Sequence, residues 1–516
     1  MKLKDYLLIT VFTIISPLIH GYYFNVLDNH HYLPYLNKLL NPALYLNDYY
    51  FSQPLSLYLP FNYFIVFIKK LFNLNLPWTY FIIYFISLWL LYFAVYYLTY
   101  TIYKRSEISF LAVFLFLLPK WAAQIGHMTH HFYFVSRDLS LAVSLIALTL
   151  IILKKTWLSL IFILSATFIN ASIPIPLAIF WLLPWFKKFK NKLPSLLVFN
   201  SSWLNTLKKR GAYSFPHLWK WTGWGNLVLF LSLLITSEFI LKDKIFNKHT
   251  KIIKQFLFLC SGLFLFHFII SAIIPTPVLI QLQLLRSLNY IFILALISFS
   301  ALNYQFLVSQ SKLFYFSSLI AVTAVFLWGD HLTIWHFLGI WLLPLLILLK
   351  KPQLKKTINQ KLFFPTILIL LLSFVFYKLF IIKPKINLPY YFYYPNALIK
   401  IDNFDDWLDI QIWAKNNTSE DKIFLTPLQQ QGFRSSSQRS IVGDRKDGGA
   451  VFYSRDYALE WQKRMNDLDG YSDFNTRQFL DLSQKYQFDY LVVENSHQPL
   501  GFDLVYQNLK YLVYKI

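Results

Sequence analysis

Long apolar runs separated by short basic loops occupy the first three quarters of the chain. A helix needs roughly 20 mostly apolar residues to cross a bilayer, and most of these runs approach that length. They predict helices over the following ranges: 5–22, 77–101, 106–122, 133–153, 223–241, 255–275, 287–307, 312–328, 332–349 and 362–382. Two shorter helices, broken near Asn170 and Pro174, are expected within 156–186. The pattern therefore predicts a polytopic α-helical membrane protein with about 11 to 13 transmembrane helices.

Basic residues set the expected orientation of these helices. Two lysines precede the first helix, and the loop 350–361 (KKPQLKKTINQK) is strongly basic. Under the positive-inside rule such segments stay in the cytoplasm, so we expect a multi-pass protein of the plasma (inner) membrane. The basic segment 187–222 leaves the helix count open, because either residues 192–206 hide a short crossing or 156–186 crosses only once.

The segment between the first two long runs is expected to form a first external loop, 23–76, of a transmembrane domain that covers 1–382. Residues 23–54 are polar and aromatic, and too irregular to span a membrane. Residues 55–75 are apolar but short, and Lys69-Lys70 interrupts them. We interpret this second part as a helix that lies at the outer membrane surface.

Residues 383–516 have a different character, with mixed charges and short alternating elements. Apolar strands are expected at 422–425 and 489–493, among helical patterns at 404–415, 456–468 and 474–486. Strands interleaved with helices predict a small α/β domain, and the helix count places it on the extracytoplasmic side.

The charge distribution excludes a nucleic-acid partner. The net charge is +23, but residues 1–382 hold 32 Lys+Arg and 8 Asp+Glu, whereas residues 383–516 hold 16 and 17. The excess therefore lies in short loops between apolar runs, where the positive-inside rule accounts for it. The single cysteine, Cys260, excludes an intrachain disulfide and a cysteine-based metal site.

Acidic residues and histidines gather on the side expected to be external. Asp28 follows the first helix, with His30 and His31 next to it, and Asp48 comes about twenty residues later. A carboxylate at the membrane surface is partly desolvated, which raises its pKa toward the range useful for a general base. The alternative for both aspartates is a helix cap or a solvated loop position. Asp330-His331 reads as a structural turn.

A second external segment reads HMTHHFYFVSRDLSLA. If it is helical, His127, His130 and His131 share one face, and Arg137 and Asp138 continue that face. Imidazole, guanidinium and carboxylate groups on one stripe suit a phosphate or a divalent metal. The alternative is an interfacial belt that anchors the helix.

Two further sets of basic residues have competing interpretations. Arg286 lies at the outer end of a helix and either reaches lipid headgroups or binds an anionic group of a substrate. The segment GFRSSSQRSIVGDRKDGG contains Arg434, Arg439, Asp444 and the pair Arg445-Lys446, which we expect to form a solvated surface, the alternative being a contact with the substrate or acceptor.

The order of these features resembles the GT-C superfamily of membrane glycosyltransferases. The shared pattern is an acidic residue after the first helix, a loop with surface helices, further helices, and a C-terminal extracytoplasmic domain. The first loop is similar to that of a largely uncharacterised bacterial branch through Asp28, the run His31-Tyr32-Leu33-Pro34, and Asp48. The C-terminal part is similar through three short runs: Trp413-Ala414-Lys415-Asn416, Phe424-Leu425-Thr426-Pro427 and Gly432-Phe433-Arg434.

The resemblance implies transfer of a sugar from a polyprenyl-phosphate donor to an extracytoplasmic acceptor, which could be a glycan, a lipid or a protein. It implies that Asp28 activates the acceptor or helps to hold a divalent metal, Mg²⁺ or Mn²⁺. Positive charge for the phosphate would come from His127, His130, His131, Arg137 or Arg286. The loop departs from the family pattern because Asn29 and His30 follow Asp28, without an Asp-x-Asp or Asp-Glu pair.

Two other functions compete with the glycosyltransferase. One is a transporter or flippase for a lipid-linked intermediate, a class that places ionisable groups near the bilayer midplane and shows internal repeats. The other is a non-enzymatic envelope-assembly protein whose C-terminal domain binds a partner.

Overall fold

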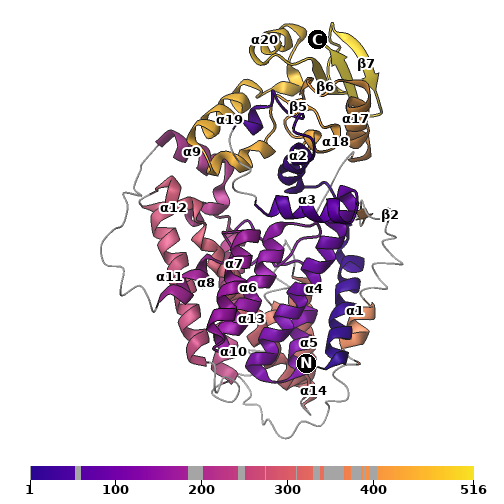
Figure 1. The fold of residues 1–516 in the computed structure, drawn as a ribbon. Helices are drawn as coiled ribbons and strands as arrows, with labels where there is room; N and C mark the ends of the chain where they lie inside the picture. Colours follow the sequence, from indigo (N-terminus) through magenta and orange to yellow (C-terminus); the bar gives the residue numbers. More distant parts are fainter. Residues whose placement is uncertain are drawn as a thin grey trace. The chain divides into compact units, whose positions relative to one another are not determined.

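The structure is a computed structural model that describes residues 2–52, 60–183, 201–241, 250–308 except 274, 311–328, 338–341, 365–373 except 366, 385–387, 391–393 and 404–516. The chain forms two compact units (Figure 1). Unit 1 comprises residues 1–23, 80–197 and 213–398, and unit 2 comprises 24–79, 198–212 and 399–516. The sequence assigned the first external loop to the transmembrane domain, whereas the structure groups most of that loop with the C-terminal residues.

The helices of unit 1 largely match the apolar runs. They are α1 (Leu3–His20), α4 (Leu76–Tyr103), α5 (Ser106–Leu115), α6 (Ser136–Ile152), α7 (Thr156–Ile169), α8 (Ile175–Leu182), α10 (Trp221–Leu241), α11 (Thr250–Ala272), α12 (Pro277–Gln281), α13 (Leu288–Leu307) and α14 (Lys312–Leu327). Among the described residues, five segments are long and apolar enough to cross a membrane: Leu3–His20, Leu76–Tyr103, Trp221–Leu241, Lys251–Ala272 and Leu279–Leu307. The break near Asn170 and Pro174 is confirmed, because it separates α7 from α8.

The expected helix over 106–122 is too long. Helix α5 ends at Leu115, and residues 116–135 have no helix. Pro119 and Gly126 fall in this stretch, and Gly126 has φ +67°, a value that suits glycine. A short antiparallel sheet of β1 (Tyr22–Tyr23), β3 (Tyr391–Tyr393) and β2 (Lys385–Asn387) completes the described part of unit 1.

Some expectations fall on residues outside the described ranges. These are the helix at 332–349 for its larger part, much of the helix at 362–382, and the turn Asp330-His331. The possible crossing at 192–206 lies only partly within them, and its described end belongs to α9 (Ser201–Arg210) of unit 2.

Unit 2 combines first-loop helices with an α/β sheet. The first loop supplies α2 (Asn29–Leu40), a 3₁₀ turn at Tyr49–Phe51, and α3 (Phe61–Leu71). The C-terminal helices are α17 (Phe404–Asn417), α18 (Phe433–Ser437), α19 (Arg455–Asp467) and α20 (Thr476–Tyr486). The three longer ones confirm the helical patterns expected there.

The sheet of unit 2 has five strands in the order β5-β4-β6-β8-β7. They are β4 (Ile423–Leu425), β5 (Ser440–Ile441), β6 (Tyr490–Glu494), β7 (Asp503–Gln507) and β8 (Tyr511–Lys515). The first three in spatial order are parallel, and β6, β8 and β7 are antiparallel. The strands β4 and β6 were expected from the sequence, which confirms the α/β class of this part.

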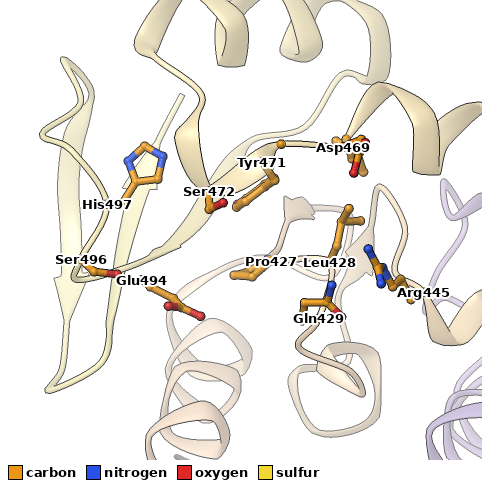
Figure 2. A pocket seen from close by; sticks show the side chains of 12 residues that line it. Pro427, Leu428, Gln429, Arg445, Asp469, Tyr471, Ser472, Glu494, Ser496 and His497 are labelled. Carbon is orange, nitrogen blue, oxygen red and sulfur yellow. The ribbon is translucent and has the colours of Figure 1, made fainter.

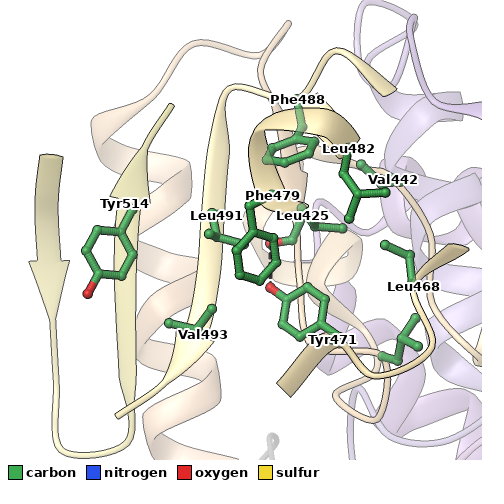
Figure 3. Packing of buried hydrophobic residues seen from close by; sticks show 11 residues of the cluster. Leu425, Val442, Leu468, Tyr471, Phe479, Leu482, Phe488, Leu491, Val493 and Tyr514 are labelled. Carbon is green, nitrogen blue, oxygen red and sulfur yellow. Dashed lines mark hydrogen bonds between the residues drawn. The ribbon is translucent and has the colours of Figure 1, made fainter. Parts of the chain in front are cut away.

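Both faces of the central strands β4 and β6 are buried. Leu425 and Leu491 pack with α20 on one face, in the cluster drawn in Figure 3. Phe424 and Val492, their neighbours in the chain, pack with α17 and α18 on the other face. Alternation along a strand sends successive side chains to opposite faces, which explains this division. The chain is therefore mostly helical, with candidate membrane helices and a small C-terminal sheet.

Candidate functional site

Asp28 lies in unit 2 at the N-terminus of α2. Its side chain is 23% exposed, and its Oδ1 accepts a hydrogen bond from Lys446 Nζ at 2.7 Å, which makes a salt bridge. The residue just before it, Leu27, has φ +48°, and Asn25 has φ +59°. A leucine in this left-handed region is uncommon and strained, and such strain often accompanies functional sites. Lys446 lies in a segment that the sequence predicted to be solvated, and no sequence pattern indicated its contact with Asp28.

The two histidines after Asp28 are hydrogen-bonded within unit 2. Nε2 of His30 lies 2.9 Å from the carbonyl oxygen of Asn25, and Nδ1 of His31 lies 2.8 Å from the Tyr50 hydroxyl. Burial, and then the charge of Lys446, lowers the pKa of His30 to about 4. The same causes hold the pKa of His31 well below its usual value. Both rings are therefore neutral at pH 7 and can serve as hydrogen-bonding groups.

Asp48 belongs to a buried network around Arg434. The Arg434 guanidinium donates to both oxygens of Asp48 at 2.6 and 2.9 Å, and to both oxygens of Asp447 at 2.7 and 3.0 Å. The backbone amides of Tyr50 and Ile441 also donate to Asp48, at 2.9 and 3.0 Å. Bidentate pairing of this kind fixes geometry, so the network ties the first loop to the C-terminal segment.

The expectation of a solvated surface at GFRSSSQRSIVGDRKDGG is wrong for its central residues. Arg434, Arg439 and Asp444 are at most 4% exposed. Arg439 is buried because its guanidinium donates to the carbonyl oxygens of Lys415, Gln438 and Thr418. A charged side chain tolerates burial when such partners replace water.

Asp444 makes the stability of unit 2 depend on pH. Burial, and then the charge of Asp447, raises the pKa of Asp444 to about 7. The folded protein therefore keeps this proton where the unfolded chain releases it. The stability that this proton contributes is fully present below the ordinary aspartate pKa of about 4. It is lost as the pH rises from there to about 7. We expect Asp444→Asn to flatten this dependence in denaturant midpoints measured from pH 4 to 8, and an unchanged slope would contradict the assignment.

Two glycines of the C-terminal segment allow the histidine rings to approach. A Cβ on Gly432 would lie 2.3 Å from the His30 ring, and one on Gly449 would lie 2.3 Å from Nε2 of His31. Gly432 also has φ +82°. Glycine is thus required at position 449 by close packing against His31.

Gly449→Ala is expected to destabilise unit 2 by about 1–3 kcal/mol, because the added methyl group displaces His31 from Tyr50. Thermal unfolding of the purified protein measures the loss. Gly501→Ala is the matched control, since its nearest neighbour would lie at 3.8 Å. Equal melting temperatures for the two variants would contradict the contact.

His127, His131 and Asp138 form a buried cluster in unit 1. Asp138 Oδ1 lies 3.2 Å from His127 Nε2 and 2.9 Å from His131 Nδ1. The expected helical stripe is wrong, because residues 127–135 form a loop that folds back onto the first turn of α6. The backbone amide of His131 donates to Asp138 Oδ2 at 2.7 Å and holds this loop in place.

This cluster can hold a metal ion. The three ligand atoms lie within 4.8 Å of one another, and all three residues are buried. The Asn289 side-chain nitrogen lies 3.1 Å from Nδ1 of His127 and fixes the orientation of the ring. Asn289 carried no signal in the sequence that linked it to the histidines.

His130 lines a small cavity together with His131 and Asp138, but neither it nor the two arginines belongs to the three-residue ligand set. The His130 ring packs 5.4 Å from His20 and is buried. Arg137 lies on the first turn of α6, beside Asp138 in the chain. Arg286 is 6% exposed and donates a hydrogen bond to Ser172 Oγ. The structure therefore does not gather all the predicted phosphate-binding residues into one cluster.

Comparison with known proteins gives few matches. Residues 405–468 match a family model described as a domain of unknown function, DUF6798. No curated protein matches the chain. A solved structure of an Archaeoglobus fulgidus oligosaccharyltransferase, tethered with an acceptor peptide containing the NVT sequon via a disulfide bond, is similar at 14% identity. That match covers 96% of this chain and 69% of the other, with a TM-score of 0.40.

Proposed function

We propose that this chain is an integral-membrane glycosyltransferase that moves a sugar from a polyprenyl-phosphate donor to an extracytoplasmic acceptor. The observation that carries the proposal is the environment of Asp28. It is a partly exposed carboxylate next to strained backbone, whereas Asp48 and Asp138 are almost fully buried. The five candidate membrane helices found among the described residues support the membrane setting.

In this proposal the Asp28 carboxylate takes the proton of an acceptor hydroxyl group. The acceptor oxygen bonds to the anomeric carbon of the donor sugar, and the bond from that carbon to the phosphate oxygen breaks. The phosphate leaves with the bonding electrons. Lys446 positions the Asp28 carboxylate through their 2.7 Å contact. This contact holds Asp28 in one side-chain conformation, from which it can accept the proton of a hydroxyl group.

The residues of the unit 1 cluster fit a divalent metal, with His127, His131 and Asp138 as ligands. Two imidazoles and one carboxylate favour Mn²⁺ or another transition metal over Mg²⁺, which prefers oxygen ligands. When bound, such a metal supplies positive charge for phosphate oxygens. Burial lowers the pKa of His127 to about 4, so its ring is in the neutral form that binds metals.

The direct test measures release of polyprenyl phosphate from polyprenyl-phosphate-linked sugars by the purified protein, in Mn²⁺ and in a chelator. Release that requires the protein supports the proposal. Tight lipid binding without release across the donor panel would contradict it and favour the transporter or the assembly protein.

A further inference from the structure

A pocket of about 280 Å³ lies in the C-terminal part of unit 2 (Figure 2). Four parts of the chain form it: residues 427–429 after β4, Arg445 after β5, residues 468–472 after α19, and Glu494, Ser496 and His497 at the end of β6. Strands β4 and β6 are parallel neighbours, so the pocket lies at the carboxyl ends of both. None of these residues belongs to the surroundings of Asp28 described above.

The chain connections make this edge of the sheet a switch point. From β4 the chain passes through α18 on one face to β5, and from β5 it passes through α20 on the other face to β6. The strands β5 and β6 therefore flank β4, and their connections lie on opposite faces. In open α/β sheets, ligands bind outside the carboxyl ends of the strands at such a point.

A buried tyrosine fixes the base of the pocket. The hydroxyl of Tyr471 donates to the carbonyl oxygen of Val492 in β6 and lies 3.5 Å from the carbonyl oxygen of Leu425 in β4. Its ring packs in the apolar cluster with Leu491 and Val493 (Figure 3). Tyr471 therefore contacts both strand ends beneath the pocket, which gives a largely preformed site.

Apolar and polar residues both line the pocket, and its polar groups are planar side chains and hydroxyl groups. The polar lining residues include Gln429, Arg445, Asp469, Ser472, Glu494 and His497. With its amide oxygen toward Arg445, Gln429 accepts from both terminal guanidinium nitrogens at 3.1 Å. Nε2 of His497 is buried and has no hydrogen-bond partner among the described residues. A hydroxyl group of a ligand or a water molecule can donate to this nitrogen.

The lining identifies the class of ligand. Two carboxylates, Asp469 and Glu494, outnumber the single guanidinium of Arg445, so an anionic phosphate would be repelled. Carboxylate and amide oxygens accept hydrogen bonds from hydroxyl groups, and serine hydroxyls and imidazole can do either. We infer that this pocket binds a neutral carbohydrate through its hydroxyl groups. As a subsite for a part of the acceptor remote from the reacting hydroxyl group, this assignment rests on the proposed function, but sugar binding itself does not.

The test is saturation-transfer-difference NMR on the full chain in a detergent without a sugar headgroup. The probes are glucose, galactose, mannose, N-acetylglucosamine and their common disaccharides. We expect saturable binding of at least one probe. Glu494→Gln should weaken it roughly tenfold or more, since a charge-assisted hydrogen bond is lost. Ser472→Trp should abolish it by filling the pocket, and Asp481→Asn on exposed α20 should leave it unchanged.

The outcomes separate this inference from the proposed function. Sugar binding that Asp28→Asn retains, with turnover absent even in the wild type, would leave the pocket assigned and overturn the glycosyltransferase. No saturable binding by any probe would overturn the pocket assignment. So would binding that is unchanged in both Glu494→Gln and Ser472→Trp, or inorganic phosphate displacing the sugar.

Discussion

Asp28→Asn is expected to lower donor turnover by roughly 10²- to 10⁴-fold, the contribution typical of a positioned general base. Asparagine has nearly the same shape and keeps an oxygen that can accept from Lys446, so the fold around α2 should persist. Turnover is measured as release of polyprenyl phosphate by the purified protein in Mn²⁺. Size-exclusion behaviour and thermal unfolding should match the wild type.

Asp481→Asn is the matched control for this variant, because Asp481 is an exposed aspartate on α20 of the same unit. It loses the same charge without touching the Asp28 surroundings, and its turnover should equal that of the wild type. Full turnover in Asp28→Asn would remove Asp28 from the reaction. Equal losses in both variants would indicate a general effect of charge.

The elements that could be predicted from the sequence are those set by local patterns. Apolar runs of membrane length predicted α4, α10, α11 and α13 to within a few residues, because hydropathy depends on each segment alone. The amphipathic patterns of α17, α19 and α20 were found for the same reason.

The contacts that could not be predicted join residues that are far apart in the sequence. Asp48 and Arg434 are 386 positions apart, and Asp28 and Lys446 are 418 positions apart. Arg434 is buried and paired with two carboxylates, but no residue next to it in the sequence distinguishes it from a solvated arginine. Sequence reasoning therefore found Asp28 as a candidate but not the lysine that contacts it.

The histidine cluster was predicted for an incorrect geometric reason. A helical stripe would place His127, His130 and His131 on one face. Pro119 and Gly126 favour an irregular chain instead, and the loop brings only His127 and His131 to Asp138. The metal-ligand residue types were recognisable from the sequence, whereas their grouping required the fold.

Arg434→Met is expected to destabilise unit 2 by about 3–5 kcal/mol, the loss typical when one partner of a buried ion pair is removed. The substitution leaves the carboxylates of Asp48 and Asp447 buried without their cation. Hydrogen exchange of peptides from unit 2 measures the loss locally. Arg477→Met, at an exposed position of α20, is the control and should change stability by less than about 0.5 kcal/mol.

The same network distinguishes two roles for Asp48. If Asp48 acts through Arg434 as a structural ion pair, Asp48→Asn lowers the stability of unit 2, while the molecules that remain folded turn over donor at the wild-type rate. If Asp48 is a base, turnover falls at temperatures where exchange shows the unit still folded. The geometry favours the first result, because Arg434 and two backbone amides already engage both carboxylate oxygens. An acceptor hydroxyl would have to displace one of these partners to reach Asp48.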